Sequence, residues 1–294
     1  MKGRFAPSPT GPLHLGNLRT ALLAWLFARS TGSGFVLRME DLDPAARGTG
    51  HEAQQIGDLT ALGLDWDGPV VRQSERLDRY HAAIDALTAD GLTYSCWCSR
   101  REIQAAASAP HEDLPEGAYP GTCRDRSEPP PGADRPPALR LRAAGARGAL
   151  VDGIAGAVDG GVDDFVLRRG DGTPAYNLAV VVDDADQGIE QVVRGDDLLA
   201  STPRQIHVGA LLGLPVPSYA HVALVHGPDG ERVAKRHGAV ALSERGGGDA
   251  VRSELATSLG LAAEGEQITM TDLLSRFDPT QVPRDPWVLG DRAE

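Results

Sequence analysis

The stretch that most restricts how this chain can fold is its start, residues 3–27. Residues 3–6 have the pattern of a short strand, and two prolines and a Thr-Gly pair at 7–11 then stop regular structure. The apolar-rich run 18–27 predicts a helix. A strand, a tight turn and a helix in this order place backbone N–H groups and the positive end of a helix dipole at the turn. We therefore expect an anion to bind there.

The turn itself carries His14, Gly16 and Asn17 and has no G-x-x-x-x-G-K-[ST] pattern, so it is not a P-loop. Gly16 would let a nucleotide approach the backbone closely. The side chains of His14 and Asn17 can donate hydrogen bonds to phosphate oxygens. The alternative for these residues alone is a helix-capping turn without a ligand.

Strand-like and helix-like segments alternate after this start, which favours an α/β fold with a parallel sheet. Residues 34–40 read as a strand that ends in an acidic cluster at 40–43, and 52–64 and 75–90 have helical spacing. Carboxylates at the carboxyl end of such a strand face the ligand crevice of the sheet. The carboxylates of this cluster are therefore candidates for the site, and a solvated loop with a helix cap is the alternative.

The organisation changes near residue 95, where loops rich in Pro and Gly begin, and 138–142 reads as a strand. Apolar, β-branched patterning resumes at 164–169 and 176–182, and 202–212 predicts a helix. From about 217 the chain turns to short helical segments, including 249–259. We expect a sheet domain in two halves (1–94 and 171–216), an insertion (95–170) and a helical region (217–294).

Composition narrows the class of protein. With 41% hydrophobic and 24% charged residues, the chain reads as an ordinary soluble globular protein. Neither a signal peptide nor a membrane span is visible, so we expect a cytoplasmic protein without membrane contact. The net charge of −12 disfavours RNA binding through bulk charge. An RNA partner would need local basic features, for which Arg100 with Arg101 and Arg140 with Arg142 are candidates.

Three cysteines are too few for a disulfide framework in a reducing compartment and leave metal binding or burial. Cys96 and Cys98 are close in sequence, and Cys123 follows with Tyr119 four positions before it. His111 would be the commoner fourth ligand beside three thiolates, because tyrosine rarely binds zinc.

Three blocks of the chain resemble the class I glutamyl-tRNA synthetases. Residues 4–17 resemble the family's opening signature, with its ATP-binding "HIGH" motif at 14–17, and 164–206 resemble the second catalytic half. Residues 233–239 resemble the "KMSKS" loop, whose second lysine falls on Lys235. Two positions depart from that loop: Arg232 replaces the first lysine and Ala234 the serine. Arg232 keeps the charge but loses the compact ammonium.

The resemblance implies a Rossmann-like class I aminoacyl-tRNA synthetase catalytic domain with a zinc-containing insertion and a small C-terminal helical domain. It implies that glutamate is activated by ATP, accompanied by Mg²⁺ held mainly through the phosphates. Catalysis of this kind is positioning plus fixed positive charge and needs no side-chain nucleophile. The implied catalytic residues are His14 and Lys235. The implied ATP-binding residues are His14, Gly16, Asn17 and Lys235. The implied glutamate-binding residues are Arg4, Phe5, Ala6, Pro7, Ser8, Glu40, Tyr176 and Arg194.

The resemblance also bears on the cysteines and on the end of the chain. It implies one structural zinc per chain held by Cys96, Cys98, Tyr119 and Cys123. About 55 residues follow Ala239, fewer than the anticodon-reading domains of full glutamyl-tRNA synthetases need. This is similar to the family's truncated paralogues, which activate glutamate without tRNA and transfer it to queuosine in the anticodon loop of tRNA(Asp). We expect a monomer of this kind.

Three alternatives remain from the sequence. The first is a minimal glutamyl-tRNA synthetase that charges a tRNA 3′ end. The second is a small-molecule adenylate-forming enzyme that needs no RNA. The third is a non-catalytic RNA-binding module, against which the intact His14, Lys235, Arg4 and Arg194 argue.

Overall fold

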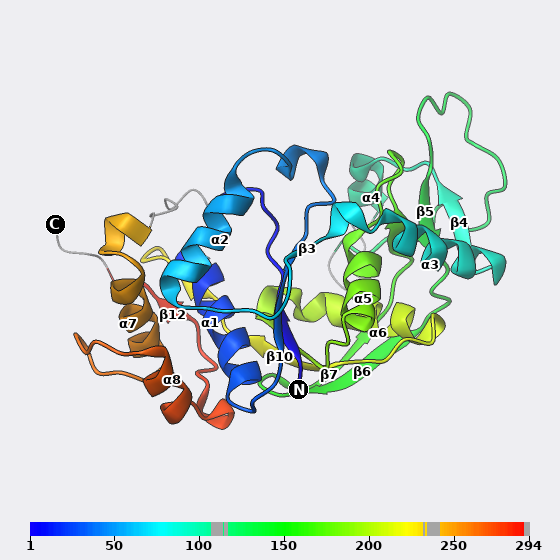
Figure 1. Ribbon diagram of the computed structural model, residues 1–294. Helices are drawn as coiled ribbons and strands as arrows, with labels where there is room; N and C mark the ends of the chain where they lie inside the picture. The colour runs from blue at the N-terminus through cyan, green and yellow to red at the C-terminus, as the bar shows by residue number, and fades with distance from the viewer. Residues whose placement is uncertain (107–113, 115–116, 232, 234–241, 291–294) are drawn as a thin grey trace.

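A computed structural model describes residues 1–106, 114, 117–231, 233 and 242–290. Its first half is the expected alternation of strands and helices around a parallel three-stranded sheet of order β1-β2-β3 (Figure 1). The elements are β1 (Gly3–Phe5), α1 (Leu15–Arg29), β2 (Phe35–Met39), α2 (His51–Leu62), β3 (Val71–Arg72) and α3 (Leu77–Ala89). Short 3₁₀ helices lie along the chain at Pro44–Ala46, Gln73–Glu75, Asp196–Ser201, Leu242–Arg245 and Pro279–Gln281.

The second half of the sheet comes from far along the chain. Strands β9 (Gln191–Gly195) and β10 (Ser218–Val222) pair in parallel. Strand β9 starts beside β1, where the N–H of Gln191 donates to the carbonyl of Lys2 at 3.1 Å. Because β10 belongs to the sheet, the sheet continues past the expected boundary at residue 216.

Helices α5 (Tyr176–Asp186) and α6 (Thr202–Leu211) accompany these strands. The β-branched residues of 176–182 favour a strand, yet the segment is helical. Leu178 and Val182 of α5 are buried in a cluster shared with α3 and α6. This packing overrides the local preference for strand.

Both faces of the sheet are buried, as is usual for parallel strands. Leu37 and Val193 face α1, which is apolar on nearly all sides and packs against β1, β9 and α8. Val36, Val192 and Tyr219 face the other way, toward a small cluster that α6 joins. Val193 and Ala220 face α1. Since side chains alternate along a strand, the residues that follow them, Arg194 and His221, point to this second face.

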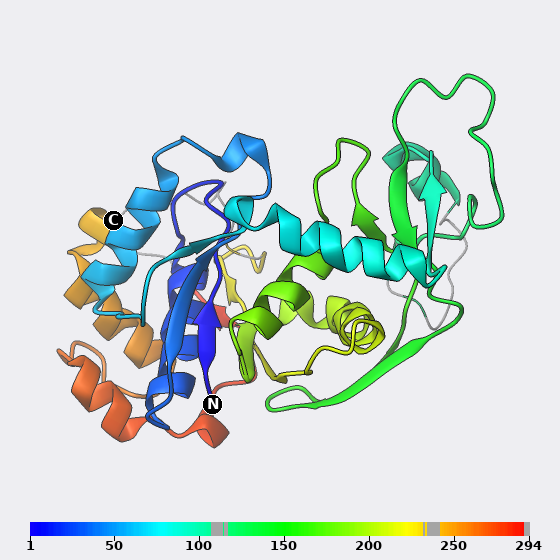
Figure 2. The same ribbon diagram turned by 45° about the vertical axis from the view of Figure 1, so that its right-hand side comes forward.

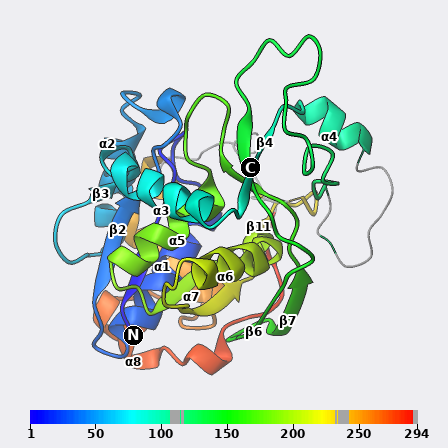
Figure 3. The same ribbon diagram turned by 90° about the vertical axis from the view of Figure 1, so that its right-hand side faces the viewer.

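The segment after α3 forms a separate antiparallel sheet of order β4-β5-β8, seen at the right of Figure 2. Its elements are β4 (Thr93–Cys96), α4 (Arg100–Ala106), β5 (Ala138–Leu141) and β8 (Val166–Arg168). A hairpin of β6 (Arg147–Asp152) and β7 (Gly156–Gly161) instead lies under α6 (Figure 3). A Cβ built on Gly148 would come 2.6 Å from the Cα of Pro203, so the hairpin touches α6 without side chains between them.

The last part of the chain packs against α1 and α2. It contains β11 (Val225–His226), α7 (Gly248–Ser258), α8 (Met270–Arg276) and β12 (Trp287–Val288). Helix α7 packs on α2, and a Cβ on Gly248 would come 1.8 Å from the carbonyl oxygen of Ala61. Among the described residues, the helices are all too short or too polar to cross a membrane.

Candidate active site

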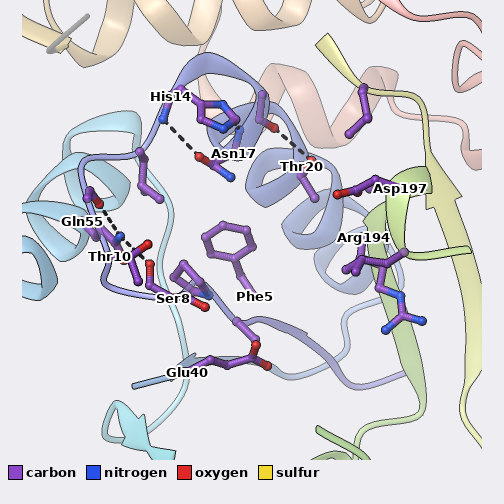
Figure 4. Close-up of a pocket in the computed structure, with 18 of the residues that line it drawn as sticks. Phe5, Ser8, Thr10, His14, Asn17, Thr20, Glu40, Gln55, Arg194 and Asp197 are labelled. Carbon is purple, nitrogen blue, oxygen red and sulfur yellow. Dashed lines mark hydrogen bonds between the residues drawn. The ribbon is translucent and has the colours of Figure 1, made fainter. Parts of the chain in front are cut away.

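A cavity of about 580 Å³ lies above the carboxyl ends of β1 and β9 and beside the start of α1. It brings together every residue that the sequence assigned to ATP or glutamate within the described part of the chain. These are Arg4, Phe5, Ala6, Pro7, Ser8, His14, Gly16, Asn17, Glu40, Tyr176 and Arg194. Figure 4 shows His14 and Asn17 at one end of the cavity, Glu40 and Arg194 at the other, and Phe5 between them. Lys235, Arg232 and Ala234 lie outside the described residues.

His14 and Asn17 cap α1 reciprocally. The backbone N–H of Asn17 donates to Nδ1 of His14 at 3.3 Å, and the N–H of His14 donates to Oδ1 of Asn17 at 3.2 Å. The capping turn and the cavity wall are thus the same residues. Because Nδ1 accepts a hydrogen bond, the single ring proton of a neutral His14 must be on Nε2. That ring is then a donor, as a phosphate site requires.

The absence of a side chain at Gly16 leaves room for the His14 ring as well as for a ligand. A Cβ on Gly16 would lie 3.1 Å from Cε1 and Nδ1 of the His14 ring. The imidazole therefore rests directly on the glycine, and a side chain there would displace it.

Glu40 lies at the other end of the cavity with its side chain 9% exposed. Its carboxylate is 3.3 Å from the fully buried guanidinium of Arg38. Burial raises the pKa of Glu40, and the Asp184 carboxylate adds to this effect, while Arg38 and Arg4 act in the opposite direction. A bound ammonium group would place a further positive charge beside this carboxylate and favour its ionised form.

Arg4 and Arg38 share a second carboxylate, that of Asp184 in α5. The distances from Asp184 Oδ1 are 3.3 Å to Nε of Arg4 and 2.8 Å to Nη1 of Arg38. Burial opposes ionisation here too, but Arg38 and Arg4 together lower the pKa of Asp184. Arg4 is therefore held at the cavity wall by a carboxylate that stays ionised.

Arg194 reaches the cavity from the end of β9. Its Nη2 donates to Oγ1 of Thr202 at 2.9 Å. Its Nη1 lies 3.5 Å from the hydroxyl of Tyr176, at the outer limit of a hydrogen bond. Arg194 and Tyr176, which come from separate elements, thus meet at one place in the wall.

Sequence reasoning missed several residues of the wall, among them Thr20, Gln55 and Asp197. Gln55 in α2 is 1% exposed, and its amide nitrogen donates to the carbonyls of Ser8 at 3.1 Å and Gly11 at 2.7 Å. It therefore fixes the shape of the opening turn. A polar residue on the apolar side of the 52–64 pattern was the available signal.

The three cysteines gather with Tyr119 at the end of β4. The Sγ atoms of Cys96, Cys98 and Cys123 lie within 4.8 Å of one another. The hydroxyl of Tyr119 is 3.3 Å from Sγ of Cys96 and 3.5 Å from Sγ of Cys98. Three sulfurs and one oxygen converging on one point suit a tetrahedral metal. His111 lies outside the described residues.

One expectation about RNA contact is wrong. Arg140 is 6% exposed, donates to the carbonyl of Asp164 at 2.8 Å, and covers the ring of Tyr119 at 3.7 Å. Its alternation with leucines in β5 resembles that of a solvent-facing residue, but Tyr119 and Asp164 cover that side of the strand. Arg142 is half-buried over Tyr94, whereas Arg100 and Arg101 are exposed.

Comparison with known proteins gives a consistent result. The family described as tRNA synthetases class I (E and Q), catalytic domain, matches residues 1–288. A Nocardia farcinica protein named Glutamyl-Q tRNA(Asp) synthetase is 59% identical, over 98% of this chain and 93% of its own length. A Symbiobacterium thermophilum protein of the same name is 48% identical, over 97% and 94%. Glutamate--tRNA ligase 1 of Alkalilimnicola ehrlichii is 42% identical, over 95% of this chain and 60% of its own length.

Among solved structures, a glutamate tRNA ligase from Elizabethkingia meningosepticum in complex with its amino acid superposes with a TM-score of 0.82. It is 27% identical, and the match covers 99% of this chain and 67% of that one. The similarity therefore extends over both halves of the sheet and the segment between them.

Proposed function

Because this chain belongs to the class I tRNA synthetases for glutamate and glutamine, a family of ligases, we propose that it activates glutamate with ATP while no tRNA is bound. The glutamate is then transferred to queuosine in the anticodon loop of tRNA(Asp). One observation carries the proposal: the residues assigned to glutamate and those assigned to the nucleotide line the two ends of a single cavity.

In the activation step, a carboxylate oxygen of glutamate forms a bond to the α-phosphorus of ATP as the bond to pyrophosphate breaks. Negative charge grows on the phosphate oxygens, so the step is favoured by fixed donors and cations. We assign the phosphates to His14 and the amino end of α1, which line the cavity. Lys235 is assigned the same task from the other side, and Mg²⁺ would accompany the phosphates of ATP.

The other end of the cavity suits an amino acid with two carboxylates. Arg4 and Arg194 are assigned to the carboxylates, Tyr176 to a hydrogen bond with one of them, and Glu40 to the ammonium. Arginine is suited to this because its N–H groups match a carboxylate's two oxygens. Phe5, Ala6, Pro7 and Ser8 would form the wall between the two ends.

In the transfer step, a hydroxyl of the queuosine cyclopentene diol attacks the carbonyl carbon of glutamyl-adenylate, loses its proton, and AMP leaves. The support for this acceptor comes from the relatives named Glutamyl-Q tRNA(Asp) synthetase, which match this chain over nearly their whole length. Exposed Arg100 and Arg101, in the segment 95–170 that we assign to RNA contact, could hold the backbone of a stem.

We also assign one structural zinc to Cys96, Cys98, Tyr119 and Cys123. The convergence of the four donor atoms supports it. The ion would join β4 to the loop at 119–123 and contribute to the stability of this segment.

Two measurements test the proposal. The first is glutamate-dependent exchange of pyrophosphate into ATP without RNA, and its absence would contradict activation. The second traces labelled glutamate onto an anticodon stem-loop of tRNA(Asp) that contains queuosine, with the guanosine stem-loop as control. Label found only at the 3′ end of intact tRNA(Glu) would instead identify a minimal glutamyl-tRNA synthetase.

A further inference from the structure

Arg194 has a buried partner on the neighbouring strand. In the parallel pairing of β9 and β10, His221 is the residue directly opposite Arg194. Nε of Arg194 lies 3.0 Å from Nε2 of His221, and His221 is 1% exposed. The other ring nitrogen, Nδ1, lies 2.6 Å from Oδ2 of Asp152 at the end of β6. The three side chains form a continuous buried row.

The row fixes where the imidazole proton lies. Nε–H of an arginine can only donate, so Nε2 of His221 must accept. Nδ1 then carries the proton and donates it to the carboxylate of Asp152. Burial and the nearby Arg194 cation lower the pKa of His221, which favours this neutral form.

Asp152 is well suited to the end of the row. Its Oδ1 accepts the backbone N–H groups of Ile154 and Ala155, both at 2.9 Å, and that of His221 at 3.1 Å. Although burial acts in the other direction, the N–H of Ala155 and the ring of His221 are among the groups that lower the pKa of Asp152. The carboxylate is thus ionised and held in one orientation by the hairpin.

We propose that Asp152 and His221 are positioning residues that orient the guanidinium of Arg194 for a carboxylate of glutamate. The inference rests on the proposed function, because it takes glutamate as the ligand of Arg194. Of the five N–H groups of Arg194, three meet His221, Thr202 and Tyr176 among the described residues. Two remain, which is the number that a bidentate carboxylate contact uses.

The hairpin is thereby linked to the amino-acid end of the cavity. Strand β6 packs on α6 and β10, and the N–H of Gly153 donates to the carbonyl of Tyr219 at 2.8 Å. Asp152 therefore sits in a fixed relation to β10 and, through His221, to β9. The hairpin makes no contribution to the cavity wall, yet in this arrangement it determines the pose of an arginine that does.

The sharpest variant is Asp152→Asn, which keeps the size of the side chain. With Oδ1 still accepting backbone N–H groups, the new amide would point N–H at Nδ1 of His221. The ring proton must then move to Nε2, where it opposes Nε–H of Arg194. We expect KM for glutamate in pyrophosphate exchange to rise about 10- to 100-fold, as for small misplacements of a binding group, with KM for ATP changed less than about twofold.

Asp159→Asn is the matched control, because Asp159 lies on the same hairpin but is exposed and paired with Arg147. It should leave both KM values unchanged. His221→Gln places an oxygen near the position of Nε2 and should bind glutamate more tightly than His221→Leu, which cannot accept. This second pair serves if Asp152→Asn does not fold.

Nitrogen-15 spectra of labelled histidine give a readout that a purely structural role would not move. Wild-type His221 should show a proton on Nδ1, and Asp152→Asn should shift it to Nε2. An unchanged KM for glutamate in Asp152→Asn, an equal rise in KM for ATP, or a wild-type proton on Nε2 would each overturn the inference. If the wild type shows no glutamate-dependent exchange, the proposed function fails. The position of the ring proton on His221 still tests whether Nε2 accepts a hydrogen bond from Arg194.

Discussion

Nε of Arg4 lies 3.3 Å from the carboxylate of Asp184, so β1 and α5, 180 positions apart, share a buried ion pair at the cavity wall. Asp184 also meets Arg38, and both arginines are buried. One carboxylate thus connects a cavity arginine to the interior of the protein.

Asp184→Asn should lower the stability and the use of glutamate together. Leaving two buried arginines short of a counter-charge costs about 3–5 kcal/mol. Because the folded-state pKa of Asp184 lies below 3.8, its contribution is present at neutral pH and is lost only as the pH falls below 3.8. Urea denaturation of the two proteins from pH 7 to 3 should therefore show a gap that narrows only at the acid end.

Asp186→Asn, on the same helix but with a partly exposed side chain, is the control and should cost at most about 1 kcal/mol. Equal losses for the two variants would show that Asp184 has no special role.

Glu40→Gln should act in the opposite direction on stability. The folded-state pKa of Glu40 is raised, so its stabilising contribution is complete below the ordinary value of 4.5 and is lost as the pH rises through the folded value. Near pH 8 the glutamine variant should melt at a higher temperature than the wild type, and the difference should vanish near pH 4. The same variant should fail to use glutamate, since the ammonium loses its counter-charge. A lower melting temperature at pH 8 would contradict the burial argument.

Removing one of the three thiols should lower the zinc content and the thermal stability of the protein. Purified protein should contain about one zinc per chain, and Cys123→Ser should lower both the zinc content and the melting temperature. Elemental analysis and calorimetry on the same preparations measure both. A wild type without metal, melting as the variant does, would rule out a structural zinc.

Lys235→Ala should slow pyrophosphate exchange by on the order of 10²–10³, the usual loss for one fixed group that stabilises transition-state charge. Lys235→Arg keeps the charge and should lose less. A rate in Lys235→Ala within about threefold of the wild type would show that this loop departs from its family in function as well as in sequence.

The sequence predicts those parts of the site that depend on local pattern. The turn at 7–17 predicts the end of the cavity that we assign to the nucleotide, and the apolar run after it predicts α1. The acidic cluster at 40–43 follows from its place at the end of a strand, whereas the choice of Glu40 within it depends on the resemblance. Arg4, Tyr176 and Arg194 depend on the resemblance, because nothing local distinguishes them from structural residues.

What the sequence does not predict depends on contacts between distant residues. His221 meets Asp152 across 69 positions, and Gln55 reaches Ser8 across 47. Arg140 has the sequence pattern of an exposed residue, but in the folded protein it packs against the ring of Tyr119. The β-branched residues at 180–182, in the middle of α5, favour a strand, but packing against α3 and α6 makes the segment helical.

The joining of β1 to β9 has a consequence for how the protein is made. A ribosome finishes α1 at residue 29 but must add about 165 residues before β9 is complete, which takes roughly 10–30 s. During that time one apolar side of α1 has no native partner and is open to association with other chains. Fragments that stop before residue 191 should therefore aggregate rather than fold as half of the domain, and slower growth in the cold should favour soluble full-length protein.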